Sequence, residues 1–80
     1  MNNTLQTETY NGWANYETWN VALYIQNEYG LYDLARNFSD YDELANVMFM
    51  EYGMKETGDG VKWNDPKINR CELNEMLADL

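Results

Sequence analysis

The side chains that most often carry out enzyme chemistry are scarce in this sequence. Histidine, the commonest general base and metal ligand, is absent. Ser39 is the only serine, and Cys71 is the only cysteine. Cys71 falls in the first turn of an expected helix, where the helix dipole favours the thiolate, but it has no histidine or second cysteine as a partner. The sequence therefore predicts no catalytic residue, and we expect a protein that is not an enzyme.

Carboxylates are the remaining candidates for acid–base or metal chemistry. Asp40, Asp42 and Glu43 lie close together, but they are explained by the start of a helix, where the dipole favours negative charge. Asp59 and Asp65 do not match the ligand spacing of an EF-hand. The sequence has no glycine-rich loop of the kind that binds phosphate. We therefore expect no metal site and no cofactor.

The charge balance bears on the kind of partner. The chain has 14 acidic and 5 basic residues, a net charge of −9. Because nucleic acid is itself a polyanion, this surplus disfavours direct binding to it and complements a basic surface on a partner protein. The simpler interpretation is that acidity keeps a small protein soluble, since charged residues make up 24% of the chain, an average share.

Cellular location is predicted from what the sequence lacks. A single cysteine fits a reducing compartment, and the first residues show no secretion signal. No apolar run approaches the roughly 20 residues of a membrane span. We expect a cytoplasmic protein without membrane contact.

The elements that position these residues are expected to be helices. The densest apolar stretch spans residues 12–25, with Asn15 placed to cap a helix over residues 16–29. Its apolar residues, Trp19 among them, cover an arc of roughly 200°, which predicts burial against more than one neighbour. Gly30 is expected to end this helix in a left-handed conformation. A short second helix over residues 31–38 then follows after a tight turn.

Two further helices are predicted from their caps. The third begins after Ser39 or Asp40 and ends at Gly53, with Phe49 and Tyr52 on its apolar stripe. The fourth begins at Asn69, with the third helical position placed to complete a capping box. Residues 54–67 are expected to form a loop or small hairpin, with Trp63 folded back over the helices.

Together these patterns predict an all-α, compact single domain of about four short helices. Residues 1–11 are expected to be a flexible N-terminal arm, and residues 12–80 a single helical domain.

Tyrosines and acids are the candidates for contact with a partner. Tyrosine is enriched in interface cores, and Tyr24, Tyr29 and Tyr32 fall on the first two helices. For Trp13, Tyr16 and Trp19 we favour the alternative that they fill the core. The predicted partner-binding residues are Tyr24, Tyr29, Tyr32, Asp33, Asp40, Asp42, Glu43 and Glu51.

Residues 12–25 read Gly-Trp-Ala-Asn-Tyr-Glu-Thr-Trp followed by an apolar helix. This string resembles the opening signature of a family of short uncharacterised proteins from tailed phages and bacteria. Residues 59–68 and 72–77 are similar to the closing part of the same family. The family has no known activity, so the resemblance implies no functional residue. It implies a phage or mobile-element setting, in which small acidic proteins often bind and block a host protein.

Three functions remain open. The leading hypothesis is a small, acidic, non-enzymatic protein that binds a host protein in the host cytoplasm and inhibits or redirects it, as in host takeover or anti-defence. The second is a DNA mimic, whose acids replace phosphates, although duplex DNA carries about one charge per 1.7 Å and the acids of this chain are sparser. The third is a structural or assembly subunit that forms a homo-oligomer.

Overall fold

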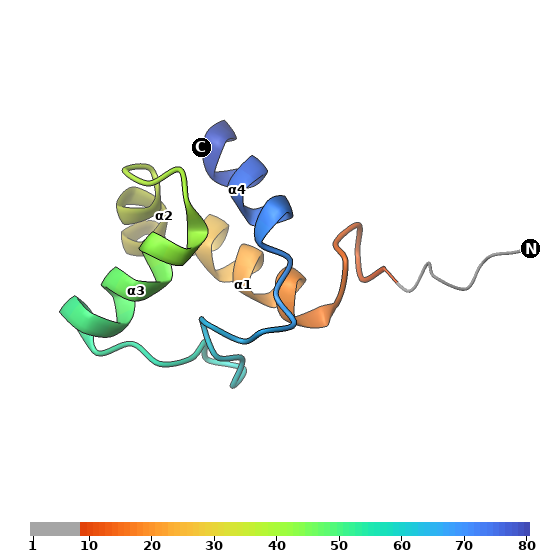
Figure 1. Cartoon of the computed structure of the whole chain (residues 1–80), viewed down its shortest axis with the longest axis horizontal. Coiled ribbons are helices and arrows are strands. Elements are labelled where there is room, and N and C mark those ends of the chain that lie inside the picture. Colours follow the sequence, from red (N-terminus) through yellow and green to blue (C-terminus); the bar gives the residue numbers. More distant parts are fainter. Residues whose placement is uncertain (1–8) are drawn as a thin grey trace, which may run out of the picture.

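The computed structural model describes residues 9–80, and its helices are numbered in Figure 1. They are α1 (Tyr16–Asn27), α2 (Tyr29–Ala35), α3 (Tyr41–Tyr52) and α4 (Arg70–Asp79). Between residues 9 and 80 there is no β-strand. The predicted all-α fold of about four short helices is confirmed. Residues 1–8, which are most of the predicted N-terminal arm, lie outside the described part of the chain.

The junction between α1 and α2 differs from the prediction. Asn15 caps α1 as expected, and its side chain accepts a hydrogen bond from the Thr18 N–H. The helix is interrupted at Glu28, whose backbone is extended (φ −95°, ψ 112°), whereas Gly30 lies inside α2. The predicted left-handed stop at Gly30 is wrong, because glycine permits a positive φ but does not require one.

The other helix ends follow their local signals. Asp40 caps α3, and Gly53 ends it in the left-handed conformation (φ 67°). Asn69 caps α4 by accepting from the Glu72 N–H. Glu72 does not complete a capping box. Its Oε1 instead accepts from the Ala14 N–H at 2.9 Å, which ties the start of α4 to the entrance of α1.

The core is built where α1, α3 and α4 meet. α1 packs against α2 and α4, and α3 packs against α4. The connection between α3 and α4 contributes Trp63, which is 2% exposed, so the prediction that this ring folds back over the helices is confirmed. The core residues are Val21, Ala22, Ile25, Ala35, Tyr41, Leu44, Ala45, Met48, Val61, Trp63, Ile68, Leu73, Met76 and Leu77.

The connection between α3 and α4 reverses direction without forming strands. Glu56 and Lys62 make an isolated antiparallel bridge, and the Thr57 N–H donates to the Val61 carbonyl at 2.8 Å. In Figure 1 the connection then runs past the start of α1 before α4 begins. This is the loop or small hairpin expected for residues 54–67.

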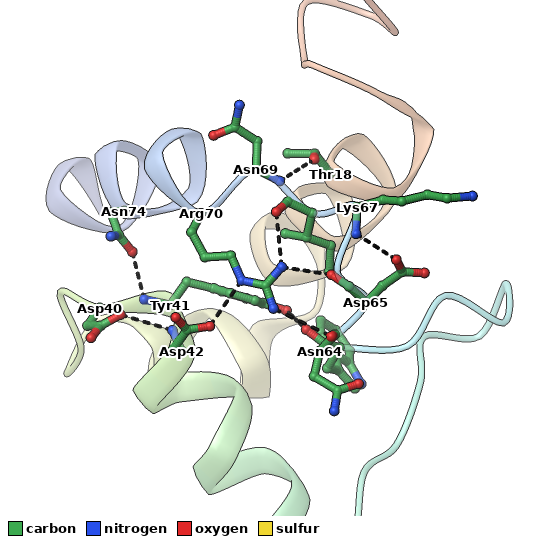
Figure 2. A network of polar contacts seen from close by, with 12 residues as sticks. Thr18, Asp40, Tyr41, Asp42, Asn64, Asp65, Lys67, Asn69, Arg70 and Asn74 are labelled. Carbon is green, nitrogen blue, oxygen red and sulfur yellow. Dashed lines mark hydrogen bonds and ion pairs between the residues drawn. The ribbon is translucent and has the colours of Figure 1, made fainter.

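Buried polar side chains attach this connection to α1. The Thr18 hydroxyl donates to Asn15 Oδ1 at 2.6 Å and accepts from the Asn69 N–H at 2.9 Å, as Figure 2 shows for the second bond. Asn15 also donates to the Lys67 carbonyl. The fully buried Thr18 therefore joins the N-terminal ends of α1 and α4.

A second buried amide holds the turn at residues 57–61. Asn20 is fully buried on α1 and accepts from the Thr57 hydroxyl at 2.6 Å. Its amide group donates to the Asp59 carboxylate at 2.8 Å. The Thr57 hydroxyl in turn accepts from the N–H groups of Asp59 and Val61. The polar residues within the first apolar stretch are thus used to fix the chain's own fold.

Trp19 lies outside the core, contrary to the sequence-based expectation. Its ring centroid is 4.9 Å from that of Tyr10 and 5.6 Å from that of Tyr16, and all three rings are partly exposed. Tyr16 and Trp19 are one turn apart on a face of α1 other than the one that buries Val21. The apolar arc of α1 is therefore wider than its contact with the core. Of the three rings expected inside, only Trp13 packs against the core.

Candidate protein-binding face

A groove of about 470 Å³ lies between the α1–α2 junction, the end of α3 and the connection that follows α3. Its walls are mainly apolar, and among residues 9–80 Glu28 and Glu56 are its only charged lining residues. We call it the apolar groove, and it is lined by Tyr24, Glu28, Gly30, Leu31, Leu34, Tyr52, Met54, Glu56, Thr57, Gly58 and Trp63.

A second and wider groove of about 790 Å³ lies beside α3. It shares Met54, Glu56 and Trp63 with the apolar groove, so the two grooves adjoin at these side chains. Phe49 also lines it, together with polar residues that include Lys55 and Lys62. We call it the α3 groove.

Four large apolar side chains on α2 and α3 are more than half exposed. Tyr29 is 81% exposed, and Tyr52 is 61% exposed. Met50 and Phe49 follow at 69% and 52%. Tyr52 lines the apolar groove, Phe49 lines the α3 groove, and Tyr29 stands between two lining residues, Glu28 and Gly30. A clustered apolar surface of this kind is typical of binding sites, whereas single exposed apolar residues are ordinary.

The structure places the three predicted tyrosines differently. Tyr24 lines the apolar groove, and burial together with the nearby Asp59 carboxylate raises the pKa of its hydroxyl. Tyr29 is exposed and does not itself line the groove, although its sequence neighbours Glu28 and Gly30 do. Tyr32 is partly buried on α2, with the Arg36 guanidinium 5.8 Å from its ring centroid, and does not line the groove.

Two of the predicted acids have structural partners. Asp40 accepts from the Asp42 N–H at 3.0 Å as the α3 cap. Asp42 accepts from the Arg70 guanidinium at 3.0 Å. Figure 2 shows Arg70 reaching from α4 to this carboxylate and to backbone carbonyls of the connection, including that of Asp65. Arg70 thus fixes the path into α4, and Asp42 helps to hold it there.

The remaining predicted acids are exposed and separated. Asp33 lies on α2, and Glu43 and Glu51 lie near opposite ends of α3. At a rise of about 1.5 Å per residue, the two α3 acids are about 12 Å apart along the helix. None of the three forms an ion pair within residues 9–80. The structure does not bring them together into one dense row of charge.

Sequence reasoning missed several residues of this face. Phe49 and Tyr52 were expected on the buried stripe of α3, but both are exposed. The sequence does contain a sign that some apolar residues of α3 are exposed, because this helix carries more of them than one buried stripe can hold. Nothing in the sequence indicates that Glu28 and Glu56 share a site, since only the folded chain brings them to one groove.

The described residues offer few groups for catalysis or metal binding. Within them, no group of three or more His, Cys, Asp or Glu side chains could hold a metal ion. Cys71 is exposed on α4. Burial raises the pKa of Tyr41 well above its ordinary value, and the hydroxyl donates to the Trp63 carbonyl. None of the helices seen in residues 9–80 is long and apolar enough to cross a membrane.

Fold and surface together define a small all-α domain that presents an apolar groove beside exposed aromatic side chains. The chain belongs to a family of unknown function (DUF7249), whose model matches residues 6–80. This confirms the expectation of an uncharacterised family, while the phage setting stays a prediction. Comparison with curated proteins and with solved structures gives no match.

Proposed function

We propose that this chain is a small, acidic, non-enzymatic protein-binding domain that engages its partner through the apolar groove and the aromatic side chains beside it. The observation that carries the proposal is the exposure of Tyr52, which lines that groove, together with the exposure of Tyr29, whose sequence neighbours Glu28 and Gly30 line it. Fully burying a large apolar side chain contributes roughly 1.5–3 kcal/mol. A partner that covers the groove gains this contribution from side chains that the chain itself leaves exposed.

The charge of the chain indicates the character of the partner. Glu28 and Glu56 line the apolar groove, and no lysine or arginine lines it. The whole chain carries a net charge of −9. A partner with basic residues around an apolar anchor therefore matches this surface, and complementary charge also speeds association. A second copy of the chain brings the same negative charge to the contact, which disfavours the alternative of a homo-oligomeric subunit.

The proposed setting is infection. The resemblance of residues 12–25 to phage proteins supports a host protein as the partner, and inhibition or redirection of that protein as the outcome. DNA mimicry has weaker support, since Glu43 and Glu51 stand about 12 Å apart along α3, far from the spacing of phosphates.

The test is affinity capture with the full-length chain from bacterial lysate, compared across two double variants. Tyr29→Ser with Tyr52→Ser removes the exposed ring that lines the apolar groove and the exposed ring of Tyr29, whose sequence neighbours line it. Tyr10→Ser with Tyr16→Ser is the matched control, because it removes two partly exposed tyrosines that line neither groove. Circular dichroism establishes that both variants remain folded.

We expect a stoichiometric partner to be captured by the wild type and the control, and to be lost with the groove variant. Capture that survives in the groove variant would move the binding surface elsewhere. Failure to recover any stoichiometric partner would contradict the proposal itself. Binding through the groove should lose little affinity between low and moderate salt, whereas a DNA mimic should lose much.

A further inference from the structure

The two grooves adjoin at a buried hydrogen-bond donor that the chain does not use. Trp63 is 2% exposed, and its indole Nε1 has no hydrogen-bond partner. Within residues 9–80 it is the only buried side-chain nitrogen or oxygen in this condition. Native structures leave few buried polar groups unpaired, so each exception needs an explanation.

General looseness of the polar interior does not explain it. The buried Thr18, Asn20 and Thr57 side chains all make hydrogen bonds. The Tyr41 hydroxyl donates to the backbone carbonyl of Trp63 itself. These buried polar groups therefore all have hydrogen-bond partners, whereas the indole N–H of Trp63 has no acceptor.

The position of the indole connects it with binding. Trp63 lines both the apolar groove and the α3 groove. Met54 also lines both and is only partly buried. Methionine is unbranched and adapts readily to a new neighbour. For a ligand to reach the buried indole N–H, a side chain that lines the grooves must move, and Met54 is the one best suited to adapt.

The surroundings limit which acceptor fits. A carboxylate acceptor in the apolar groove would meet the like charge of Glu28 and Glu56, since Lys55 and Lys62 line the α3 groove and not this one. A backbone carbonyl is neutral and accepts well from an N–H. Carbonyls in the interior of a helix are already bonded to the helix itself, whereas an extended segment offers free carbonyls along its length.

Building on the proposed function, we propose that the partner presents an extended, basic segment. One apolar side chain of this segment enters the apolar groove, and a neighbouring backbone carbonyl accepts a hydrogen bond from Trp63 Nε1. Lysine or arginine residues on either side of the anchor face Glu28 and Glu56.

The test uses the full-length, ¹⁵N-labelled chain and the peptide acetyl-Arg-Lys-Leu-Lys-Arg-amide as the probe. The chain has three tryptophans, so three indole N–H signals are expected. Trp13→Phe and Trp19→Phe identify two of them, and the third is assigned to Trp63 without altering this core ring. A second probe replaces the leucine carbonyl with an alkene, and a third replaces the basic residues with glutamate.

With the first peptide we expect the Trp63 indole signal to shift and its exchange with solvent to slow. Backbone signals of Leu31, Leu34 and Tyr52 should shift together with it. The alkene peptide should bind roughly 2- to 12-fold more weakly, the range of a neutral hydrogen bond, without moving the indole signal. The glutamate peptide should not bind.

Two contrary results have different meanings. If the groove signals shift while the Trp63 indole signal stays unchanged and the alkene peptide binds equally well, this inference is wrong and the proposed function stands. If no groove signal shifts, or if shifts are confined to the acidic residues of α4, the apolar groove does not bind basic segments, and both the inference and the proposed binding face fail.

Discussion

Replacing Asn20 with alanine tests whether the buried amide holds the connection on α1. Asn20 is fully buried, and its side chain makes two hydrogen bonds, with the Thr57 hydroxyl and the Asp59 carboxylate. Asn20→Ala removes both bonds and leaves the Thr57 hydroxyl proton without its acceptor. It keeps the helix intact, because alanine is the best helix former.

The expected loss of stability follows from these contacts. Two net hydrogen bonds contribute about 1–3 kcal/mol, and the unpaired Thr57 hydroxyl and the small cavity add to this. We therefore expect Asn20→Ala to lower the free energy of unfolding by about 2–4 kcal/mol. A domain of 80 residues has roughly 4–12 kcal/mol in total, so this is a large fraction of its stability.

Urea unfolding followed by circular dichroism measures the effect. Asn27→Ala is the matched control, because Asn27 is the exposed last residue of the same helix, and its replacement should change stability by less than about 0.5 kcal/mol. A double-mutant cycle with Thr57→Val isolates the Asn20–Thr57 bond from the cavity. Equal stability of the two alanine variants would refute this structural role of Asn20.

Three further predictions concern the aromatic cluster, the α3 cap and pH. Trp19→Ala should lower the free energy of unfolding by about 1–2 kcal/mol, less than the roughly 3–5 kcal/mol for a fully buried aromatic ring, because Trp19 is partly exposed. Thermal melting measures this loss, and complete unfolding of the variant would show that Trp19 is a core residue. Asp40→Asn with Glu43→Gln should lower stability by only about 0.5–1.5 kcal/mol, since asparagine also caps well, and a larger loss in urea unfolding would contradict this. Burial raises the pKa of Tyr41 in the folded chain, so the unfolded chain loses this proton first as the pH rises. The contribution of Tyr41 to the free energy of unfolding should therefore be fully present below about pH 10 and decrease above it. Urea unfolding across that range measures the decrease, which should be smaller in Tyr41→Phe.

Local signals were enough to predict where most helices begin and end. Asn15, Asp40 and Asn69 each have a short side chain that accepts a hydrogen bond from an N–H in the first turn. Gly53 ends α3 because its φ of 67° costs glycine nothing. These interactions lie within a few residues of each other, so the sequence contains both partners.

Interactions between distant residues could not be predicted in the same way. The role of Glu72 is one example, since its carboxylate accepts from Ala14 across 58 positions. The interruption of the helix at Glu28 was missed for a different reason, because glycine at position 30 is a stronger local stop signal than glutamate at position 28. Trp19 was misplaced because hydrophobicity alone does not say which part of a wide apolar arc meets the core.

The candidate site was predicted only in part for the same reason. The sequence predicts Tyr24, which lines the apolar groove, and Tyr29, whose two sequence neighbours line it. The groove itself needs side chains from α1, α2, α3 and the connection after α3, and only the tertiary fold brings these together. Exposed Tyr52 belongs to this set, although its spacing on α3 had indicated burial.

The most distinctive stretch of the sequence is therefore explained mainly by folding rather than by binding. Asn15 and Thr18 join the ends of α1 and α4, and Asn20 holds the turn that precedes Trp63. By fixing that turn, Asn20 helps to place Trp63 and Met54 between the two grooves. A change at Asn20 should consequently affect binding through the position of the connection, even though Asn20 lines neither groove. The signature-like residues stabilise the fold that supports the grooves. The groove walls themselves consist of less distinctive residues such as Glu28, Tyr52 and Met54.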